Sequence, residues 1–213
     1  CFISFDYRAG STKRVYAVAI DGAGNYASGW NGPKLLCDVS SKQYSESLSR
    51  TNEGYVVSWR DYRNSNNDIY AQHIGFSGDL LGPSDGIPII VSNNEQKSSI
   101  TMYSSVNNSI LSCWQDYENG SDFDINCVAT DLNDFTNGSL INLVSADGDQ
   151  VDPQGVVSSS GQYIITWSDL RNASSGFDIY YQILDESFMN EVALGGESVS
   201  SASYDQTNPQ ISR

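Results

Sequence analysis

Short apolar runs alternate with polar turns along the whole chain, and the runs are rich in β-branched and aromatic residues. Residues 55–59, 110–114 and 163–167 are typical runs, and Asp, Asn, Gly and Ser are frequent between them. This composition favours strands over helices. No segment keeps a hydrophobic period of 3.6 residues, so helices should be nearly absent. The pattern therefore predicts an all-β protein.

The strand-like runs belong to a unit that is repeated four times. An aspartate follows the second run of each unit at intervals of 55, 55 and 53 residues, at Asp6, Asp61, Asp116 and Asp169. A second phrase follows each aspartate, as in Asp68-Ile69-Tyr70. A period of this size indicates a repeat architecture, and repeated groups of four short strands are typical of a β-propeller.

The repeats predict four blades of four antiparallel strands in a single domain. Their approximate boundaries are residues 1–42, 43–95, 96–149 and 150–205. The chain opens inside a second strand, and residues 206–213 repeat the start of a first strand, so pairing of the two ends completes the first blade. We expect a four-bladed β-propeller closed in this way. Exchange of the last strand between copies and membership of a larger propeller are the alternatives.

Composition narrows the partners and the location of the protein. The chain has 11 lysines and arginines against 26 aspartates and glutamates, which gives a net charge of −15. Such a surface repels nucleic acids and anionic membranes. No apolar run approaches the roughly 18 residues that a membrane span needs. The chain begins at Cys1, so we expect a processed product or a piece, and four cysteines among many Asn and Ser residues favour an extracellular or cell-surface location.

The cysteines predict one disulfide. Cys113 and Cys127 lie on successive strands of one predicted hairpin, equally far from a turn near Gly120. A bond between them closes a loop of about 15 residues, which is worth roughly 3 kcal/mol in the chain-entropy treatment. Cys1 and Cys37 fall on strands that are not adjacent, so their pairing stays open.

Two further patterns concern modification and metal binding. Glycosylation sequons begin at Asn107, Asn119, Asn137 and Asn172. Chance matches are expected in a chain this rich in Asn and Ser, and the sequons matter only if the source glycosylates asparagine. A turn with three carboxylates is a candidate calcium site, at Asp147, Asp149 and Asp152. Calcium needs six to eight oxygen ligands, so a solvated acidic turn is the default interpretation.

The repeat also bears on catalysis, because one active site needs one copy of each residue. An aspartate at a strand end can accept backbone N–H groups of the following turn. Arg63 and Arg171, two residues after an aspartate, can pair with a carboxylate of the same hairpin, such as Asp68 or Asp178. His73 is the single histidine and is expected to be a partly exposed strand residue. We therefore assign no catalytic residue.

The hairpin tips after the aspartates are the candidate ligand-binding surface. They carry tyrosines at one repeat position and arginines at the next, which are Tyr7, Tyr62, Tyr117, Arg8, Arg63 and Arg171. Aromatic faces beside polar groups suit a sugar or a protein partner. The alternative is that each tyrosine packs over its own hairpin.

The repeated phrase Trp-x-Asp-x-Arg followed by Asp-Ile-Tyr-x-Gln resembles repeats in secreted and surface β-propeller proteins of bacteria, and is distantly similar to the TolB-type repeat. Two repeats match fully, with Asp61, Arg63, Asp68, Ile69, Tyr70, Gln72 and Asp169, Arg171, Asp178, Ile179, Tyr180, Gln182. The third repeat departs with Glu118 for Arg and Asn126 for Tyr, and the first with Ser4 for Trp. The resemblance implies a propeller and leaves the activity open.

These observations lead to a functional hypothesis. We expect a non-enzymatic extracellular module that binds a glycan or a protein, or that takes part in assembly. A glycan-cleaving hydrolase of propeller type is one alternative, and a subunit that polymerises through its terminal strand is another. No cofactor is expected apart from calcium.

Overall fold

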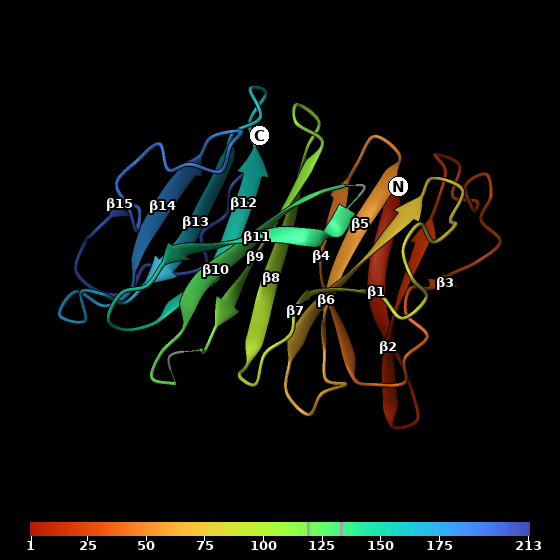
Figure 1. Ribbon diagram of the computed structural model, residues 1–213, viewed down its shortest axis with the longest axis horizontal. Helices are drawn as coiled ribbons and strands as arrows, with labels where there is room; N and C mark the ends of the chain where they lie inside the picture. Colours follow the sequence, from red (N-terminus) through yellow and green to blue (C-terminus); the bar gives the residue numbers. More distant parts are fainter. Residues whose placement is uncertain (119, 133) are drawn as a thin grey trace. The chain divides into compact units, whose positions relative to one another are not determined.

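The computed structural model describes residues 1–118, 120–132 and 134–213. Its described residues form strands and no helix (Figure 1). The strands belong to four separate sheets in which every strand pair is antiparallel. The predicted all-β fold is therefore confirmed. No helix that is long and apolar enough to cross a membrane occurs in the described part of the chain.

We number the sheets 1 to 4 along the chain. Sheet 1 contains β1 (Phe2–Ala9), β2 (Thr12–Ala19) and β3 (Lys34–Leu35). Sheet 2 contains β4 (Gln43–Arg50), β5 (Gly54–Asp61), β6 (Asp68–Gly75) and β7 (Ile87–Ile90). Sheet 3 contains β8 (Gln96–Ser104), β9 (Ser109–Asp116), β10 (Asp124–Asp131) and β11 (Asp134–Val144). Sheet 4 contains β12 (Gln150–Val157), β13 (Tyr163–Asp169), β14 (Asp178–Leu184) and β15 (Glu197–Ser200).

The described chain divides into two compact units, Cys1–Asn93 and Asn94–Arg213, which we call unit 1 and unit 2. In unit 1, Trp59 of sheet 2 shares a buried cluster with Val15 of sheet 1. In unit 2, Trp167 of sheet 4 shares a buried cluster with Leu111 of sheet 3. Each unit thus buries one apolar core between two sheets, as the β-branched and aromatic strand residues predict.

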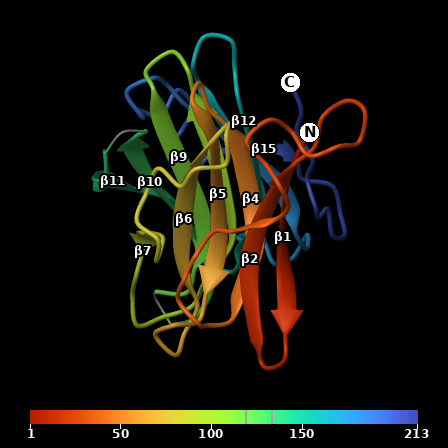
Figure 2. The same cartoon turned by 90° about the vertical axis from the view of Figure 1, so that its right-hand side faces the viewer.

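Sheet 1 has three strands, whereas sheets 2, 3 and 4 each have four. Strand β1 pairs with β2 along its whole length, from Phe2 opposite Ala19 to Ala9 opposite Thr12 (Figure 2). No strand of the described residues pairs with the other edge of β1. Sheets 2, 3 and 4 each begin with a strand that has no counterpart in sheet 1.

That first strand carries a β-bulge in sheets 2, 3 and 4. The register shifts at Ser45–Ser47 in β4, at Lys97–Ile100 in β8 and at Val151–Gln154 in β12. Ser98 and Asp152 lie within these bulges and have positive φ angles of 52° and 55°. Bulges bend a strand and redirect its side chains, and positive φ is uncommon outside glycine.

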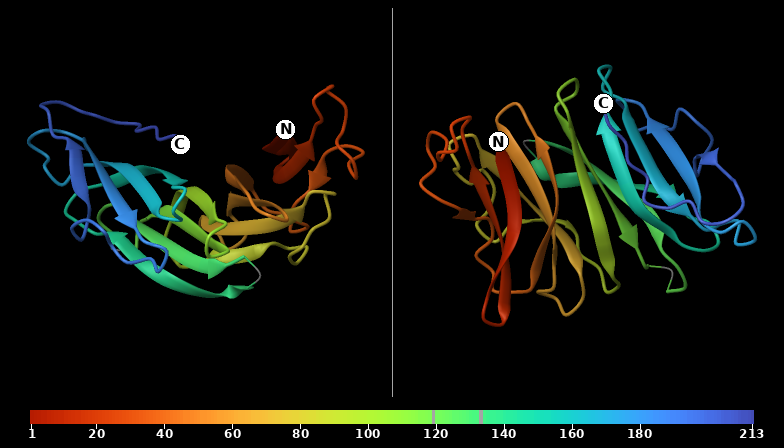
Figure 3. Two further views of the ribbon diagram at one scale, coloured as in Figure 1. Left: turned by 90° about the horizontal axis from the view of Figure 1, so that it is seen from above. Right: turned by 180° about the vertical axis from the view of Figure 1, so that it is seen from behind.

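The segment 206–213 forms no strand and runs as a coil to the C-terminus (Figure 3). Its hydrogen bonds in unit 2 repeat those of β12. The Gln150 N–H that opens β12 donates to Phe123 O at 2.6 Å. The Gln206 N–H donates to Phe177 O at the same distance of 2.6 Å. The phenylalanine N–H groups also match, because each is bound by an aspartate Oδ1 at 3.0 Å.

The equivalence continues two residues further along both segments. Asp152 N–H donates to Gln115 Oε1 of β9, and Asn208 N–H donates to Ser168 Oγ of β13, each at 3.2 Å. Asn208 has a positive φ angle of 57°, close to that of Asp152. Residues 206–213 therefore lie on sheet 4 as β12 lies on sheet 3, but without strand partners in unit 2. The predicted pairing of this segment with β1 stays a prediction.

Candidate functional site

The repeated aspartate of sheet 2 lies at the centre of a buried hydrogen-bond cluster. Asp61 Oδ2 accepts the indole N–H of Trp59 at 3.0 Å and the Gln43 amide at 3.2 Å. Its Oδ1 accepts the Ser41 hydroxyl at 2.6 Å and the backbone N–H of Arg63 at 3.0 Å. The Arg63 guanidinium completes the cluster with an ion pair of 2.6 Å to Oδ2.

These contacts explain the electrostatics of Asp61. Burial alone raises the pKa of this carboxyl, but the Arg63 guanidinium and the hydroxyl and indole donors outweigh burial and lower it. Arg63 also lies over the ring of Tyr70, with 3.7 Å from Cζ to the ring centroid. A fully buried carboxylate with this many donors stabilises a hairpin and has no face left for a substrate.

The repeated aspartates of sheets 3 and 4 in unit 2 also accept the indole N–H of the preceding tryptophan. Asp169 accepts the indole of Trp167 at 2.7 Å and pairs with Arg171 at 2.6 Å. In sheet 3, Asp116 accepts the indole of Trp114 at 2.9 Å. The arginines thus pair within their own hairpins, as expected, but with Asp61 and Asp169 and not with Asp68 and Asp178.

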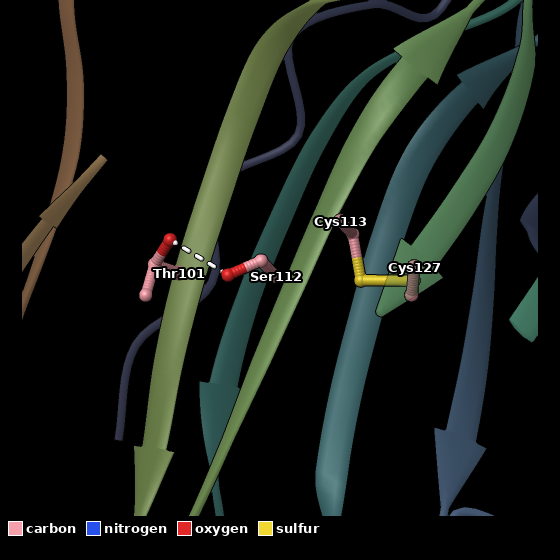
Figure 4. The surroundings of a disulfide bond; sticks show 4 residues. All are labelled: Thr101, Ser112, Cys113 and Cys127. Carbon is pink, nitrogen blue, oxygen red and sulfur yellow. Dashed lines mark hydrogen bonds between the residues drawn. A yellow bond between two sulfur atoms is a disulfide. The ribbon is translucent and has the colours of Figure 1, made fainter. Parts of the chain in front are cut away.

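The predicted disulfide between Cys113 and Cys127 is confirmed (Figure 4). The two cysteines lie directly opposite each other on β9 and β10. On the other side of β9, Ser112 and Thr101 hydroxyls hydrogen-bond at 3.2 Å between β8 and β9. The bond fits an oxidising compartment. Cys1 is exposed and Cys37 is buried, and both are free thiols.

The candidate metal and sugar attachment residues lie in unit 2. Asp149 Oδ1 accepts the Phe123 N–H at 3.0 Å, and Asp152 lies in the β12 bulge. Among the described residues, no group of three His, Cys, Asp or Glu side chains could hold a metal ion. Calcium binding at Asp147, Asp149 and Asp152 stays a prediction.

The sequon asparagines differ in their surroundings. Asn107 donates from Nδ2 to Glu186 O at 2.7 Å, so its amide nitrogen is engaged. Asn172 is exposed in the turn before β14. Asn119 lies outside the described residues, as does the side chain of Asn137.

A pocket of about 410 Å³ in unit 1 is a candidate binding site. It is lined by Lys42, Tyr44, Arg60, Tyr62 and Asn67. Tyr44 of β4 and Arg60 of β5 are cross-strand neighbours, which places both side chains on one face of sheet 2. The Arg60 guanidinium lies 4.7 Å from the Tyr44 ring centroid.

One carboxylate and one further cation adjoin this pocket. Glu46 lies in the β4 bulge, and its Oε1 is 3.3 Å from Arg60 Nε. The Glu46 side chain is 11% exposed. Lys13 of β2 lies over the Tyr44 ring at 4.0 Å and pairs with Asp6 at 2.7 Å. Two cations, Lys13 and Arg60, therefore lie over the Tyr44 ring. Cation–π attraction stabilises this arrangement, more strongly where the groups are desolvated.

The structure distributes the predicted ligand-binding residues among different environments. Tyr62 is 41% exposed and lines the pocket, and Tyr7 is 57% exposed. Tyr117 is half-buried and packs on the Phe123 ring at 5.0 Å. Arg8 is exposed, while the charges of Arg63 and Arg171 are paired within their hairpins.

Sequence reasoning missed the residues that give the pocket its charge. The position between Trp and Asp is Arg60 in sheet 2, whereas it is Gln115 in sheet 3 and Ser168 in sheet 4. The position after the repeated glutamine that opens the first strand is Tyr44 in β4 and Lys97 in β8. These pocket residues could have been found by looking for side chains that occur in one repeat only, because a single binding site needs only one copy of each residue.

Comparisons with solved structures identify the fold. An α-L-arabinanase of Penicillium chrysogenum, complexed with arabinobiose, matches 84% of the chain with 10% identity and a TM-score of 0.55. A GH93 α-L-arabinofuranosidase of Fusarium graminearum, also with arabinobiose, matches 95% with 13% identity and a TM-score of 0.55. A GH43 endo-arabinanase of Bacillus licheniformis matches 98% of this chain and 79% of its own, with 14% identity and a TM-score of 0.50.

These likenesses show a β-propeller fold and, at such low identity, the fold alone. The chain spans 58% and 61% of the lengths of the first two enzymes. No protein family and no curated protein sequence matches the chain.

The expectation of a non-enzymatic binding or assembly module is contradicted by these comparisons, in which the matching structures are glycoside hydrolases. The physical reason is that the repeat argument covers repeated residues only. It explains Asp61 and Arg63, but it does not apply to residues such as Arg60 and Glu46, which occur in one repeat.

Proposed function

We propose that the chain is a glycan-cleaving hydrolase of the β-propeller type that acts outside the cell. The observation that carries the proposal is the pocket of unit 1, in which two tyrosine rings and two cations surround a space of about 410 Å³ beside Glu46. Aromatic faces pack against the apolar faces of sugars, and the volume is in the usual range for small-ligand sites. The matched hydrolases and the disulfide support the reaction class and the location.

Glu46 is the proposed catalytic carboxylate of this reaction. Hydrolysis of a glycosidic bond needs a carboxylic acid that protonates the departing oxygen and a second carboxylate that acts as base or nucleophile. In unit 1, the carboxyl group of Glu46 contacts the pocket-lining Arg60.

The test uses the 213-residue chain with dyed arabinan and a panel of chromogenic glycosides, starting with α-L-arabinofuranosides. The wild-type chain is expected to release product, and Glu46→Gln is expected to lower kcat by about 100-fold or more. Glu53→Gln is the matched control, because Glu53 is an exposed carboxylate of the β4–β5 turn in the same unit. Absence of turnover on every glycan, or equal activity of Glu46→Gln and Glu53→Gln, would contradict the proposal.

We also propose that residues 206–213 complete sheet 1 as its first strand, which closes a four-bladed propeller within one chain. The support is the equivalence of this segment with β12 and the open edge of β1. The β12–β13 register places Gln150 opposite Asp169 and Val156 opposite Ile164. Transferred to the ends of the chain, this register places Gln206 opposite Asp6 and Ser212 opposite Cys1.

A disulfide test separates closure from strand exchange. Ser212→Cys is expected to form a bond with the native Cys1 inside one chain, seen as a monomer on a non-reducing gel and as a linked peptide pair. Phe2→Cys with Ile211→Cys tests the neighbouring cross-strand pair, and Cys1→Ser with Ser212→Cys is the control. Bonds between two copies only, or no bond in either variant, would contradict closure.

A further inference from the structure

We propose that the pocket of unit 1 binds an anionic sugar, namely a uronic acid unit of the glycan. This inference rests on the proposed function and specifies its substrate class. It is carried by the cations that line the pocket, by the surroundings of Arg60 and Lys42, and by the distribution of charge along the chain.

Lys42 is a cation without a carboxylate partner in the described chain. It is exposed, and no carboxylate of the described residues lies within ion-pair distance of its ammonium group. Its ammonium group lies over the Tyr62 ring, 5.9 Å from the ring centroid. An ammonium group at the wall of a pocket, with its charge uncompensated, favours a bound anion.

Arg60 supplies a second, more rigid cation. Its Nε is buried and lies 3.3 Å from Glu46 without making a hydrogen bond, and its Cζ lies over the Tyr44 ring. A guanidinium offers five N–H donors in a planar fork that matches a carboxylate. Because stacking on Tyr44 orients that fork beforehand, a sugar carboxylate meets a preorganised partner.

Charge is divided unequally between the two units. Residues 1–93 contain eight lysines and arginines against nine aspartates and glutamates, whereas residues 94–213 contain three against 17. An anionic glycan is repelled by the surface of unit 2 and meets a nearly neutral surface in unit 1. Within unit 1 the pocket lining contains two cations and no carboxylate.

The remaining lining residues suit the neutral part of such a sugar. Tyr44 and Tyr62 provide aromatic faces, and Asn67 provides an amide that can both donate and accept hydrogen bonds. Aromatic stacking fixes the ring of a sugar, while the two cations select the charged substituent. The combination distinguishes a uronate from a neutral pentose or hexose of similar size.

The experiment measures binding by titration calorimetry with galacturonate oligosaccharides and with neutral galactose oligosaccharides of the same length. Uronate binding is expected to be at least tenfold tighter at low salt, as one or more charge-assisted hydrogen bonds predict, and to weaken as salt is raised. Lys42→Gln is expected to remove most of that preference. Arg50→Gln is the matched control, because Arg50 is an exposed cation at the opposite end of β4.

Each outcome bears on the inference separately from the proposed function. Equal affinity for both oligosaccharides, or equal effects of Lys42→Gln and Arg50→Gln, would overturn the uronate assignment while leaving hydrolysis of neutral glycans intact. A sulfated neutral oligosaccharide that binds as tightly as the uronate would show a general preference for anions and would also overturn it. Tight uronate binding without cleavage of any glycan would support this inference and contradict the hydrolase.

Discussion

The hairpins β5–β6 and β9–β10 occupy the same place in sheets 2 and 3, but different interactions hold them together. Both place an aspartate beside a tryptophan indole, Asp61 with Trp59 at 3.0 Å and Asp116 with Trp114 at 2.9 Å. Both aspartates also accept an amide from the glutamine that opens the first strand. The aspartate–tryptophan link is therefore the constant part of the repeat.

The hairpins differ in what surrounds the aspartate. In β5–β6 the Arg63 guanidinium pairs with Asp61 and stacks on Tyr70. In β9–β10 the corresponding positions are Glu118 and Asn126, so both the cation and the ring under it are absent. Asn126 instead donates its amide to the aspartate at 3.0 Å.

In β9–β10, which lacks this ion pair, a disulfide joins the two strands. Cys113 and Cys127 are directly opposite on β9 and β10, where β5 and β6 have Ser58 opposite Ala71. A disulfide constrains the unfolded chain, whereas an ion pair acts in the folded state alone. The comparison teaches that one repeat position tolerates two physically different ways of closing a hairpin, provided that the aspartate keeps its indole partner.

The largest expected effect distinguishes the two aspartates. Asp61→Asn leaves the Arg63 charge half-buried without its counterion, so the free energy of unfolding should fall by about 3 kcal/mol. Asp116→Asn leaves no cation without a counterion, because the Trp114 and Asn126 donors are neutral. It should lower the free energy of unfolding by about 1 kcal/mol. Urea unfolding at pH 7, followed by tryptophan fluorescence and circular dichroism, measures both losses. Equal losses would mean that the ion pair contributes nothing beyond the shared hydrogen bonds.

The local part of this comparison could be predicted from sequence. The stabilisation of each hairpin by its arginine was predicted, but the partner was not: Asp68 was expected for Arg63, and the ion pair forms with Asp61. Cys113 and Cys127 are symmetric about a turn, so their register follows from the hairpin alone. Both predictions needed contacts between neighbouring strands and nothing else.

Contacts that depend on other pairings could not be predicted in the same way. Tyr44 and Arg60 are 16 residues apart and become neighbours because the β4 bulge sets the register of β4 on β5. Lys13, from another sheet, reaches Tyr44 only after sheets 1 and 2 have packed. The pocket therefore depends on tertiary structure that a repeat pattern does not contain.

The second expected effect tests the covalent alternative. Cys113→Ala with Cys127→Ala should lower the free energy of unfolding by about 3 kcal/mol, since the bond closes a loop with a sequence separation of 14 residues. Reduction of the wild-type protein should give a similar loss, and the reduced double variant should lose nothing further. Urea midpoints with and without reductant check this. Stability unchanged by removal of the bond would show that Asp116 and its neutral donors suffice.

The third prediction transfers the arginine and tyrosine of β5–β6 into β9–β10 of the variant that lacks the disulfide. Glu118→Arg with Asn126→Tyr rebuilds in β9–β10 the cation and ring of β5–β6, and should restore about 1 kcal/mol to the disulfide-free variant. Glu118→Gln with Asn126→Tyr is the matched control, because it removes the negative charge without adding a guanidinium. Equal urea midpoints for these two variants would contradict the idea that the ion pair and the disulfide are interchangeable.

The smallest expected effect separates the two hairpins by pH. His73 of β6 is buried and not partly exposed as expected, and it lies 3.4 Å from the Thr51 hydroxyl. Burial lowers its pKa, while nearby Glu53 opposes that shift. The unfolded chain therefore takes up a proton near the ordinary pKa of about 6.5 before the folded chain does. Stability contributed by the neutral ring is complete above that pKa and is lost as pH falls below it.

Between pH 7 and pH 5.5, the free energy of unfolding should thus fall by about 1 kcal/mol in the wild-type protein and stay nearly constant in His73→Gln. Ordinary aspartates and glutamates titrate below this window, so they contribute little to the difference. The chain has a single histidine, so β9–β10 has no equivalent group. Hydrogen exchange resolved by segment should show faster opening of β5–β6 at pH 5.5 while β9–β10 is unchanged. The same acceleration in both hairpins, or in His73→Gln, would show that another group causes the loss.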